Sequence, residues 1–273
     1  MATQLGTGQL STGLAWTAPE RADSPASMAG IPSSLVRARC YLEVLIPARD
    51  EARRLPRTLL SVINYLEAQP YSSAIVVIDN GSVDRTVDLI SHLPSPHVPV
   101  HLLGCAQPGK GAAVRRGILT SSARFVGFMD ADLATPIETL DMALPMLEAG
   151  CQAVVGSRRA RGATVAEPEP RQRILGGLLF KALARRIVPG IADTQCGFKI
   201  FDGDLAREAA SQLSVEGFAF DVELLRTITE MGVGIAEVPV VWSHQAGSTL
   251  RAMRDGIRGA ADVLRLAHRR GYL

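Results

Sequence analysis

The sequence lacks an uninterrupted apolar run of the roughly 18 residues that a membrane-spanning helix needs. It also lacks a basic start followed by an apolar stretch, so neither a signal peptide nor an anchor is expected. Its cysteines, Cys40, Cys105, Cys151 and Cys196, form no C-x-x-C pair, which argues against zinc or redox chemistry and for reduced thiols in the cytoplasm. The formal net charge of +2 is too small to indicate nucleic acid as a partner.

The composition is that of a globular protein, since 47% of the residues are hydrophobic and 21% are charged. Residues 1–38 are rich in Ser, Thr, Gly, Ala and Pro without a sustained period, and we expect a disordered leader there. Residues 39–273 are predicted to form one domain. Basic residues are concentrated in its second half, so the partners of that half are expected to be anionic.

Apolar segments of strand length alternate with helical segments in the first part of this domain. Such alternation predicts an α/β, Rossmann-like fold with a mostly parallel central sheet flanked by helices. The expected strands are 41–47, 74–79, 98–103, 125–130 and 153–158. Later segments are expected to form a mobile loop at 162–170, a basic amphipathic helix at 171–188, a turn and strand at 191–201, helices at 205–213 and from 218, one last strand at 235–242 and a basic helix at about 250–268.

Two acids, Asp130 and Asp132, directly follow the apolar run Phe125–Met129. Side chains two positions apart in an extended chain point the same way, so both carboxylates can converge on one cation at the strand end. Hard divalent cations such as Mg²⁺ prefer carboxylate oxygens and keep positions open for water and phosphate. The pair therefore predicts a metal site for a diphosphate, and the alternative is a solvated strand end.

Polar residues follow two other predicted strands, and the carboxyl ends of strands are where ligands bind in such sheets. Asp79 could accept a hydrogen bond from a nucleobase imide, or it could cap its own turn. Lys110 lies between Gly109 and Gly111, where the backbone can approach a phosphate closely. The spacing around Lys110 is not that of a Walker A loop.

A phosphate monoester is already an anion near neutral pH, so as an acceptor it needs cations more than a strong base. Arg158, Arg171 and Arg173 are the candidates, because a guanidinium can contact phosphate through two hydrogen bonds. For Arg159 and Arg161 a solvated surface position is the favoured interpretation.

An alcohol acceptor would instead need a general base, and Asp193 or Asp221 could provide it. Asp193 could equally brace its turn, and Asp221 could cap the helix that follows. His244, in a polar loop after the last predicted strand, is a candidate third metal ligand or diphosphate contact, with an exposed loop histidine as the plain alternative.

The predicted helix 171–188 combines an apolar stripe with positive charge. A basic amphipathic helix of this kind suits an anionic membrane surface that carries a lipid phosphate. The alternative is that the stripe packs against the core or against a second subunit of a homodimer.

Several segments in register resemble the motifs of the GT-A glycosyltransferases of family two: 44–51, 78–84, 109–117 and Asp130-Ala-Asp132. The later segments 156–158, 193–199, 218–225 and 237–242 resemble the branch that contains the dolichyl-phosphate β-glucosyltransferases and bacterial polyprenyl-phosphate relatives. The resemblance runs from about Tyr41 to the last residue. It implies a GT-A fold, a nucleotide-sugar half at about 39–157 and an acceptor half at about 158–273.

The resemblance also implies site residues and cofactors. Pro47, Arg49, Glu51 and Asp79 would border the nucleoside, and Asp130 and Asp132 would hold Mg²⁺ or Mn²⁺ with the diphosphate. Two positions depart from the family pattern. Asn80 stands where a second acid is usual, which puts the base preference in doubt. Ala134 stands where some relatives have Gln as a possible metal ligand, so water would fill that position.

The function expected from these residues is inverting transfer of a hexose, glucose from UDP-glucose, to a polyprenyl or dolichyl phosphate. The enzyme would then work in the cytoplasm or at the inner face of the membrane. A transferase that acts on a soluble small-molecule acceptor is the first alternative. The second is a sugar-nucleotide-binding module without catalysis.

Overall fold

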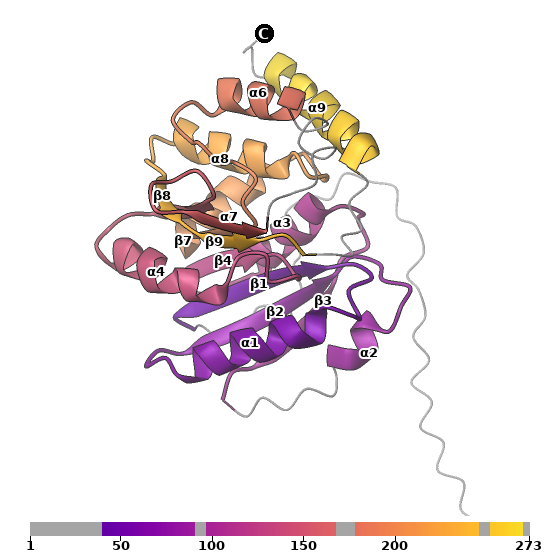
Figure 1. Cartoon of the computed structure of the whole chain (residues 1–273), viewed down its shortest axis with the longest axis vertical. Helices are drawn as coiled ribbons and strands as arrows, with labels where there is room; N and C mark the ends of the chain where they lie inside the picture. Colours follow the sequence, from indigo (N-terminus) through magenta and orange to yellow (C-terminus); the bar gives the residue numbers. More distant parts are fainter. Residues whose placement is uncertain (1–39, 91–96, 168–177, 246–251, 270–273) are drawn as a thin grey trace, which may run out of the picture.

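The computed structural model describes residues 40–90, 97–167, 178–245 and 252–269 (Figure 1). Seven strands form one sheet in the order β3-β2-β1-β4-β7-β5-β8. Strand β7 is antiparallel to β4 and β5, and the other pairings are parallel. The expectation of a mostly parallel α/β sheet is confirmed. The strand bounds are β1 Leu42–Ala48, β2 Ser73–Asp79, β3 Val100–Gly104, β4 Phe125–Met129, β5 Ala153–Ser157, β7 Phe198–Asp202 and β8 Ala236–Pro239.

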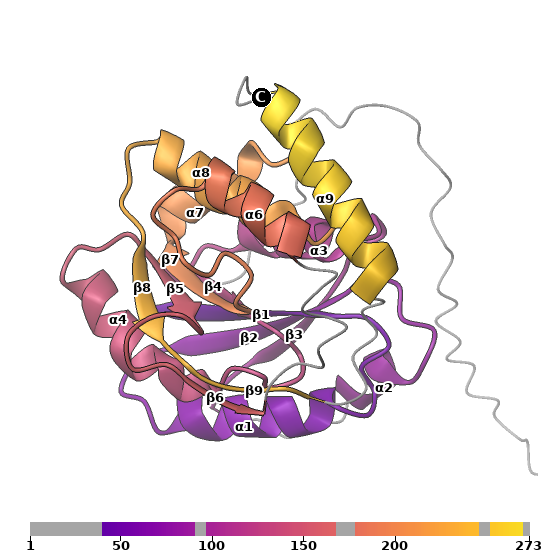
Figure 2. The same cartoon turned by 45° about the horizontal axis from the view of Figure 1, so that its top comes forward.

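Helices cover both faces of this sheet (Figure 1). One face carries α1 (Leu55–Glu67) and α4 (Leu140–Glu148), and the other carries α3 (Lys110–Thr120), α7 (Gly203–Ser211) and α8 (Phe220–Glu230). An outer layer, α6 (Leu178–Ile187) and α9 (Ala252–Arg269), packs over α8 (Figure 2). Two short elements complete the described helices, α2 (Thr86–Ile90) and the 3-10 helix η2 (Ile137–Thr139).

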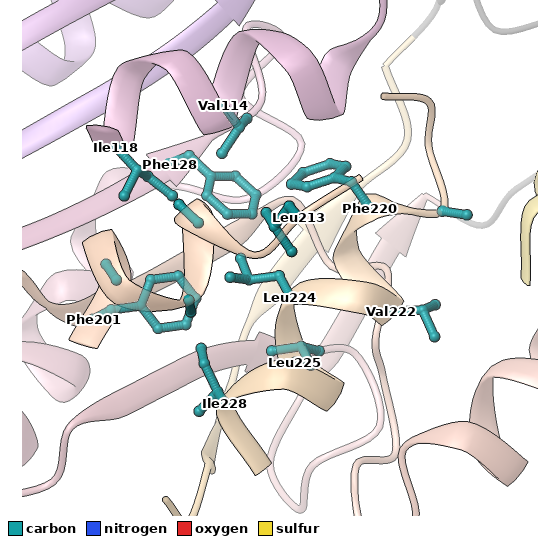
Figure 3. Packing of buried hydrophobic residues seen from close by; sticks show 14 of the residues in the cluster. Val114, Ile118, Phe128, Phe201, Leu213, Phe220, Val222, Leu224, Leu225 and Ile228 are labelled. Atoms are coloured by element: carbon teal, nitrogen blue, oxygen red, sulfur yellow. The ribbon is translucent and has the colours of Figure 1, made fainter. Parts of the chain in front are cut away.

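Most strand residues are apolar because helices cover both faces of the sheet, although the edge strand β3 is partly exposed, and Glu43 in β1 and Lys199 in β7 are buried charged residues. In β1, Val44 and Ile46 pack toward α1 and α4, whereas Leu45 packs toward α3. This alternation follows from the two-residue period of an extended chain. On the α3 side, the ring of Phe128 in β4 lies near the ring of Phe201 in β7, with centroids 6.5 Å apart, and near that of Phe220 in α8, with centroids 5.5 Å apart (Figure 3). Burial of each such side chain contributes roughly 1.5–3 kcal/mol.

Two expectations about the second half were wrong. Part of the expected loop 162–170 is a strand, β6 (Thr164–Glu167), and the expected strand 235–242 is two strands, β8 and β9 (Val241–Ser243). Strand β8 leaves the large sheet after Pro239, and β9 pairs with β6 in a separate two-stranded ribbon. The β-branched residues Thr164 and Val165 therefore pair with Val241 and Trp242, 77 positions later, which local patterning does not reveal.

This topology brings several loops together. Strands β1 to β5 and β8 end at one edge of the sheet, which we call the carboxyl edge, and the antiparallel β7 begins there. The loops after β4 and β5 and the loop before β7 therefore meet. Among the described residues, no helix is both long and apolar enough to cross a membrane. The expected leader, 1–38, lies outside the described residues.

Candidate active site

Asp130 is the first residue after β4, and the segment before β7 fixes its position. Its backbone N–H donates to the carbonyl oxygen of Gly197, with an N–O distance of 3.1 Å. A Cβ atom at Gly197 would lie 2.0 Å from Asp130 Oδ2, so only glycine lets the carboxylate lie there. Lys110 Nζ lies 2.6 Å from Asp130 Oδ1. Sequence reasoning placed both residues at the carboxyl edge, and the structure joins them in an ion pair.

Asp132 lies beside this pair in the turn after β4. Its Oδ1 accepts a hydrogen bond from the N–H of Ala134 at 3.1 Å, and Leu133 between them has a φ of 57°, a left-handed conformation that is rare for leucine. Burial, followed by the negative charge of Asp130, raises the pKa of Asp132 above its usual value. The charge of Asp130 therefore acts on the Asp132 carboxylate, and the cation that the two were expected to share stays a prediction.

Lys110 begins α3, and its side chain points toward Asp130 and Asp132. We call the site formed by these three residues the first corner. Gly109 before Lys110 has a φ of 123°, and a Cβ there would lie 2.1 Å from the carbonyl oxygen of Glu216. Lys110 Nζ lies 5.8 Å from the ring centroids of Phe128 and Phe220. Burial alone would lower the pKa of Lys110, but the nearby carboxylates, Asp130 first, outweigh it and raise that pKa. The lysine is therefore a fixed cation beside the carboxylate pair.

Asn80 shapes the loop that leads to Lys110. Its side chain is buried, and its amide nitrogen donates to the carbonyl oxygens of Cys105 at 3.2 Å and Gln107 at 2.7 Å. Its amide oxygen accepts from the N–H of Gly109 at 2.7 Å. Asp79, by contrast, accepts from the backbone N–H groups of Gly81 and Ser82. Asn80 thus takes a structural role that sequence reasoning missed, although the sequence marked this position as unusual.

The other residues expected to border the nucleoside lie just after β1. Arg49 is exposed, Pro47 is half-buried and Glu51 is buried. Glu51 forms a two-contact ion pair with Arg54, and Arg54 Nη1 lies 3.7 Å from Asp132 Oδ2. Burial raises the pKa of Glu51, and the bonds to Arg54 oppose this. Arg54 was not predicted, although its three-residue spacing from Glu51 on a helix start is a signal for such a pair.

A second corner lies at the ends of β5 and β8. A basic pocket of about 320 Å³ is present there. It is lined by Arg158, Arg159, Val165, Lys181, Arg185, Ala192, Asp193, Thr194, Gln195 and Trp242. The guanidinium of Arg158 also lies over the Trp242 ring, 5.3 Å from its centroid. Arg158 was expected to contact an anion. Arg159, expected at a solvated surface, is exposed and also lines the pocket.

Asp193 holds Arg158 in this pocket. Its carboxylate accepts from Arg158 Nε at 2.7 Å, from Nη2 at 2.9 Å and from the backbone N–H of Arg158 at 3.0 Å. Burial alone would raise its pKa, but the hydrogen bonds and charge of Arg158 outweigh burial and lower the pKa of Asp193 to about 2. Glu237 accepts hydrogen bonds from the N–H groups of Ala192 and Asp193 and so fixes the loop.

The second candidate base, Asp221, forms a buried ion pair with Lys199. Its Oδ1 lies 2.6 Å from Lys199 Nζ, and the two side chains are only 4% and 0% exposed. It lies in the first turn of α8 rather than at the cap position, which is Ala219. Lys199 was not predicted, although a single lysine in the apolar run Phe-Lys-Ile-Phe is a signal for a buried, paired cation.

Of three further predicted site residues, His244, Arg171 and Arg173, the structure describes only His244. His244 lies directly after β9, and the N–H of Ser243 before it donates to the carbonyl oxygen of Ala134 at 3.0 Å. It therefore lies on the strand end nearest to the Asp132 turn. Arg171 and Arg173 lie outside the described residues, as does the first part of the predicted helix 171–188.

The donor set of the first corner fits a hard divalent cation. Asp130 and Asp132 offer carboxylate oxygens at the mouth of the corner, with side chains 37% and 22% exposed. In the described part of the chain, no cluster of three or more His, Cys, Asp or Glu is arranged to hold a metal. A site with two carboxylates suits Mg²⁺ or Mn²⁺, which take the remaining oxygens from water and from a phosphate ligand.

Comparison with known families gives the class of protein. A model described as glycosyl transferase family 2 matches residues 43–208, which is more than half of the chain. The chain belongs to glycosyltransferase family 2, and both the expected enzyme class and the resemblance are confirmed.

Individual relatives show which members of this family the chain is similar to. The chain is 34% identical over 243 residues to a dolichyl-phosphate beta-glucosyltransferase of Dictyostelium discoideum, covering 84% of this chain and 74% of the relative. It is 31% identical over 239 residues to the Homo sapiens protein of the same name, covering 82% and 74%. A crystal structure of glucosyl-3-phosphoglycerate synthase from Mycobacterium tuberculosis, with Mn²⁺, UDP and glucosyl-3-phosphoglycerate, superposes with a TM-score of 0.63 at 20% identity, covering 85% and 80%. That likeness shows the fold, and the expected GT-A fold is confirmed.

Proposed function

We propose that this protein transfers glucose from UDP-glucose to a dolichyl or polyprenyl phosphate, with inversion at the anomeric carbon. One observation carries the proposal: the carboxylate pair with Lys110 and the basic pocket lie at the same edge of the sheet, separated by β7. The first corner suits a diphosphate with its cation, and the second suits another anion. The relatives named as dolichyl-phosphate beta-glucosyltransferases support the choice of donor and acceptor.

The spacing between the two corners supports transfer of a single sugar. Asp130 follows β4 and Arg158 follows β5, and only β7 lies between these strands. Neighbouring strands are about 4.8 Å apart, so the backbones of β4 and β5 are about 10 Å apart. That distance leaves room for one hexose ring between a donor diphosphate and an acceptor phosphate.

The state of the candidate bases favours a phosphate acceptor over an alcohol. Asp193 is held by Arg158, and a pKa of about 2 makes it a weak base. Asp221 is buried in an ion pair with Lys199. An alcohol would need one of them to accept its proton, whereas a phosphate monoester attacks as an anion. Asp193 is therefore proposed to orient Arg158.

The lining of the basic pocket matches a phosphate on an apolar chain. Lys181 and Arg185, one helical turn apart on α6, add their charges to those of Arg158 and Arg159. Trp242 and Val165, from the two strands of the β6–β9 ribbon, supply an apolar wall. A guanidinium or ammonium would bind the phosphate, and the wall would contact the adjacent part of the lipid.

Asp130 and Asp132 would hold Mg²⁺ or Mn²⁺, and Mn²⁺ is the ion in the structure of the mycobacterial synthase. When bound, the ion supplies positive charge that neutralises the departing diphosphate. Lys110 adds a second, permanent positive charge beside Asp130. Pro47, Arg49, Glu51 and Asp79 would border the nucleoside, and His244 is retained as a candidate contact to the ion or diphosphate.

The assembly around the site is part of the same proposal. Residues 39–157 would bind the nucleotide-sugar and residues 158–273 the acceptor, within one domain. The segment 171–188 would lie against the inner face of the membrane, which would bring the lipid phosphate to the pocket. In the described part of this segment, Leu183 and Ile187 of the expected apolar stripe pack against the core, so neither the membrane nor a second subunit covers them, and a homodimer stays a prediction that does not depend on them.

A donor-by-acceptor screen with mass detection tests this function. It should pair UDP-glucose and other nucleotide-sugars with a short-chain polyprenyl phosphate, a phosphorylated small molecule and water, with Mg²⁺, Mn²⁺ or a chelator. We expect a glucosylated polyprenyl phosphate with the β configuration, no product with chelator, and no product from the Asp132→Ala variant. Transfer only to small molecules would replace the lipid acceptor. Nucleotide-sugar binding without transfer or hydrolysis would instead indicate a non-catalytic module.

A further inference from the structure

Lys199 and Asp221 form an ion pair that is closed off from solvent. Lys199 lies in β7 directly opposite Phe128 of β4, and Asp221 lies in the first turn of α8. The side chains are 0% and 4% exposed, and Lys199 Nζ lies 2.6 Å from Asp221 Oδ1. Two buried charges lose their hydration, and an apolar pair of similar volume often serves stability equally well. The pair therefore calls for a reason other than stability.

The first branch of contacts from this pair leads to Asp130. Lys199 Nζ also donates to the carbonyl oxygen of Cys196 at 2.7 Å. The next residue, Gly197, accepts from the backbone N–H of Asp130 at 3.1 Å, and its Cα faces the Asp130 carboxylate. Lys199 thus holds the peptide segment against which Asp130 is placed.

The second branch leads to Lys110. Phe220, the neighbour of Asp221, lies under Lys110 together with Phe128. Lys199 Nζ lies 5.3 Å from the centroid of the same Phe128 ring. The pair between β7 and α8 therefore holds in place the two rings that Lys110 contacts.

We propose that Lys199 and Asp221 are positioning residues for the diphosphate end of the donor. By joining α8 to β7 they fix the Cys196–Gly197 segment and the Phe220 ring, so that Asp130 and Lys110 meet the diphosphate and its cation in one arrangement. The inference rests on the proposed function, because it takes a nucleoside diphosphate as the ligand of this corner. Neither residue reaches that ligand itself.

A double variant of the full chain, Lys199→Met with Asp221→Leu, tests this role without leaving an unpaired buried charge. Glu43→Gln is the matched control, because Glu43 is a buried carboxylate near the start of β1, away from the carboxyl edge. Thermal melting first establishes that each variant is folded. Calorimetric titration then measures the Kd of UDP in the presence of Mn²⁺, and steady-state kinetics measures KM for donor and acceptor separately.

We expect the double variant to weaken UDP binding at least tenfold and to raise the donor KM, with the acceptor KM unchanged. The control should change the melting temperature without moving the Kd of UDP more than twofold. Asp221→Asn, which keeps a hydrogen-bond acceptor but loses the charge, should weaken UDP binding to an intermediate extent, and it decides the matter if the double variant does not fold.

If the folded double variant binds UDP with wild-type affinity, this inference is overturned and the proposed function stays intact. The same holds for Asp221→Asn when only that variant folds. An equal rise in the KM for donor and the KM for acceptor would also overturn it, because that pattern indicates that the whole fold is loosened. If the unmodified chain binds no nucleoside diphosphate, the proposed function fails and the inference fails with it.

Discussion

Asp79 and Asn80 are neighbours in the chain, yet their side chains have different surroundings at the end of β2. Asp79 is half-buried and accepts hydrogen bonds from its own turn. Asn80 is buried and uses both its donor and its acceptor on the loop that precedes Lys110. An amide can donate to two carbonyl oxygens, which a carboxylate cannot do. The hydrogen-bond partners therefore explain why asparagine fits this position.

Replacement of Asn80 by aspartate is expected to destabilise the fold. The new carboxylate would face the carbonyl oxygens of Cys105 and Gln107, which would lose their donor. Such a loss should lower the free energy of unfolding by about 2 kcal/mol, measured by urea denaturation. Asp79→Asn is the matched control, since its amide oxygen can still accept from the turn, and it should change stability by less than about 0.5 kcal/mol. Equal stability of Asn80→Asp and wild type would contradict the assigned hydrogen bonds.

Gly197→Ala is expected to impair donor binding more than stability. The added Cβ would lie 2.0 Å from Asp130 Oδ2, so the carboxylate must move, and a displacement of this size costs roughly 10- to 100-fold at a catalytic site. UDP titration with Mn²⁺ measures the effect. Gly234→Ala provides the comparison, because no atom lies within 4 Å of its added Cβ. An unchanged UDP affinity in Gly197→Ala would show that Asp130 does not need its present position.

Among the elements, the strands and helices of the first half follow from local patterning, as do α7, α8 and α9 of the second half, whereas the strand pairing of the second half does not. Strands such as β2 and β4 contain continuous apolar runs ended by polar residues, which predicts both their type and their buried position. The pairing of β6 with β9, and the antiparallel insertion of β7 between β4 and β5, depend on contacts between distant segments. Helical spacing predicted α6 as an amphipathic helix, but only the structure assigns its cations to the pocket.

Charge reversal on α6 separates the pocket from a general surface effect. Lys181→Glu should lower kcat/KM for the lipid phosphate roughly tenfold or more, since a charge-assisted contact contributes about 1.5–3 kcal/mol. Donor hydrolysis in water should stay unchanged, because Lys181 lines the basic pocket and not the first corner. Arg186→Glu makes the same charge change at an exposed position that does not line the pocket. If both variants lose lipid transfer equally, the basic surface rather than the pocket would recruit the acceptor.

For the molecule as a whole, the sequence predicted which residues gather at the carboxyl edge but not how they pair. Asp130, Asp132, Lys110 and Arg158 each follow a predicted strand or begin a predicted helix, so a parallel sheet brings them to one edge. Their partners come from side-chain directions that no local pattern contains. Asp193, for example, could be assigned to catalysis or to bracing from sequence alone, and its three hydrogen bonds to Arg158 favour bracing.

The Asp193–Arg158 pair joins the end of β5 to the loop before β7, so its charge state should affect the stability of the whole fold. The pKa of Asp193 is lowered from 3.8 to about 2, which means that folding favours its ionised form. This contribution, about 2 kcal/mol, is fully present above pH 4 and is lost as the pH falls toward 2. Urea denaturation across this range should therefore show that Asp193→Asn is less stable than wild type at pH 6, with the difference shrinking toward pH 2. Asp204→Asn, which removes a carboxylate that is 94% exposed, controls for the loss of one negative charge. If the difference in free energy of unfolding between wild type and Asp193→Asn stays constant from pH 6 to pH 2, the charge of Asp193 does not stabilise this corner.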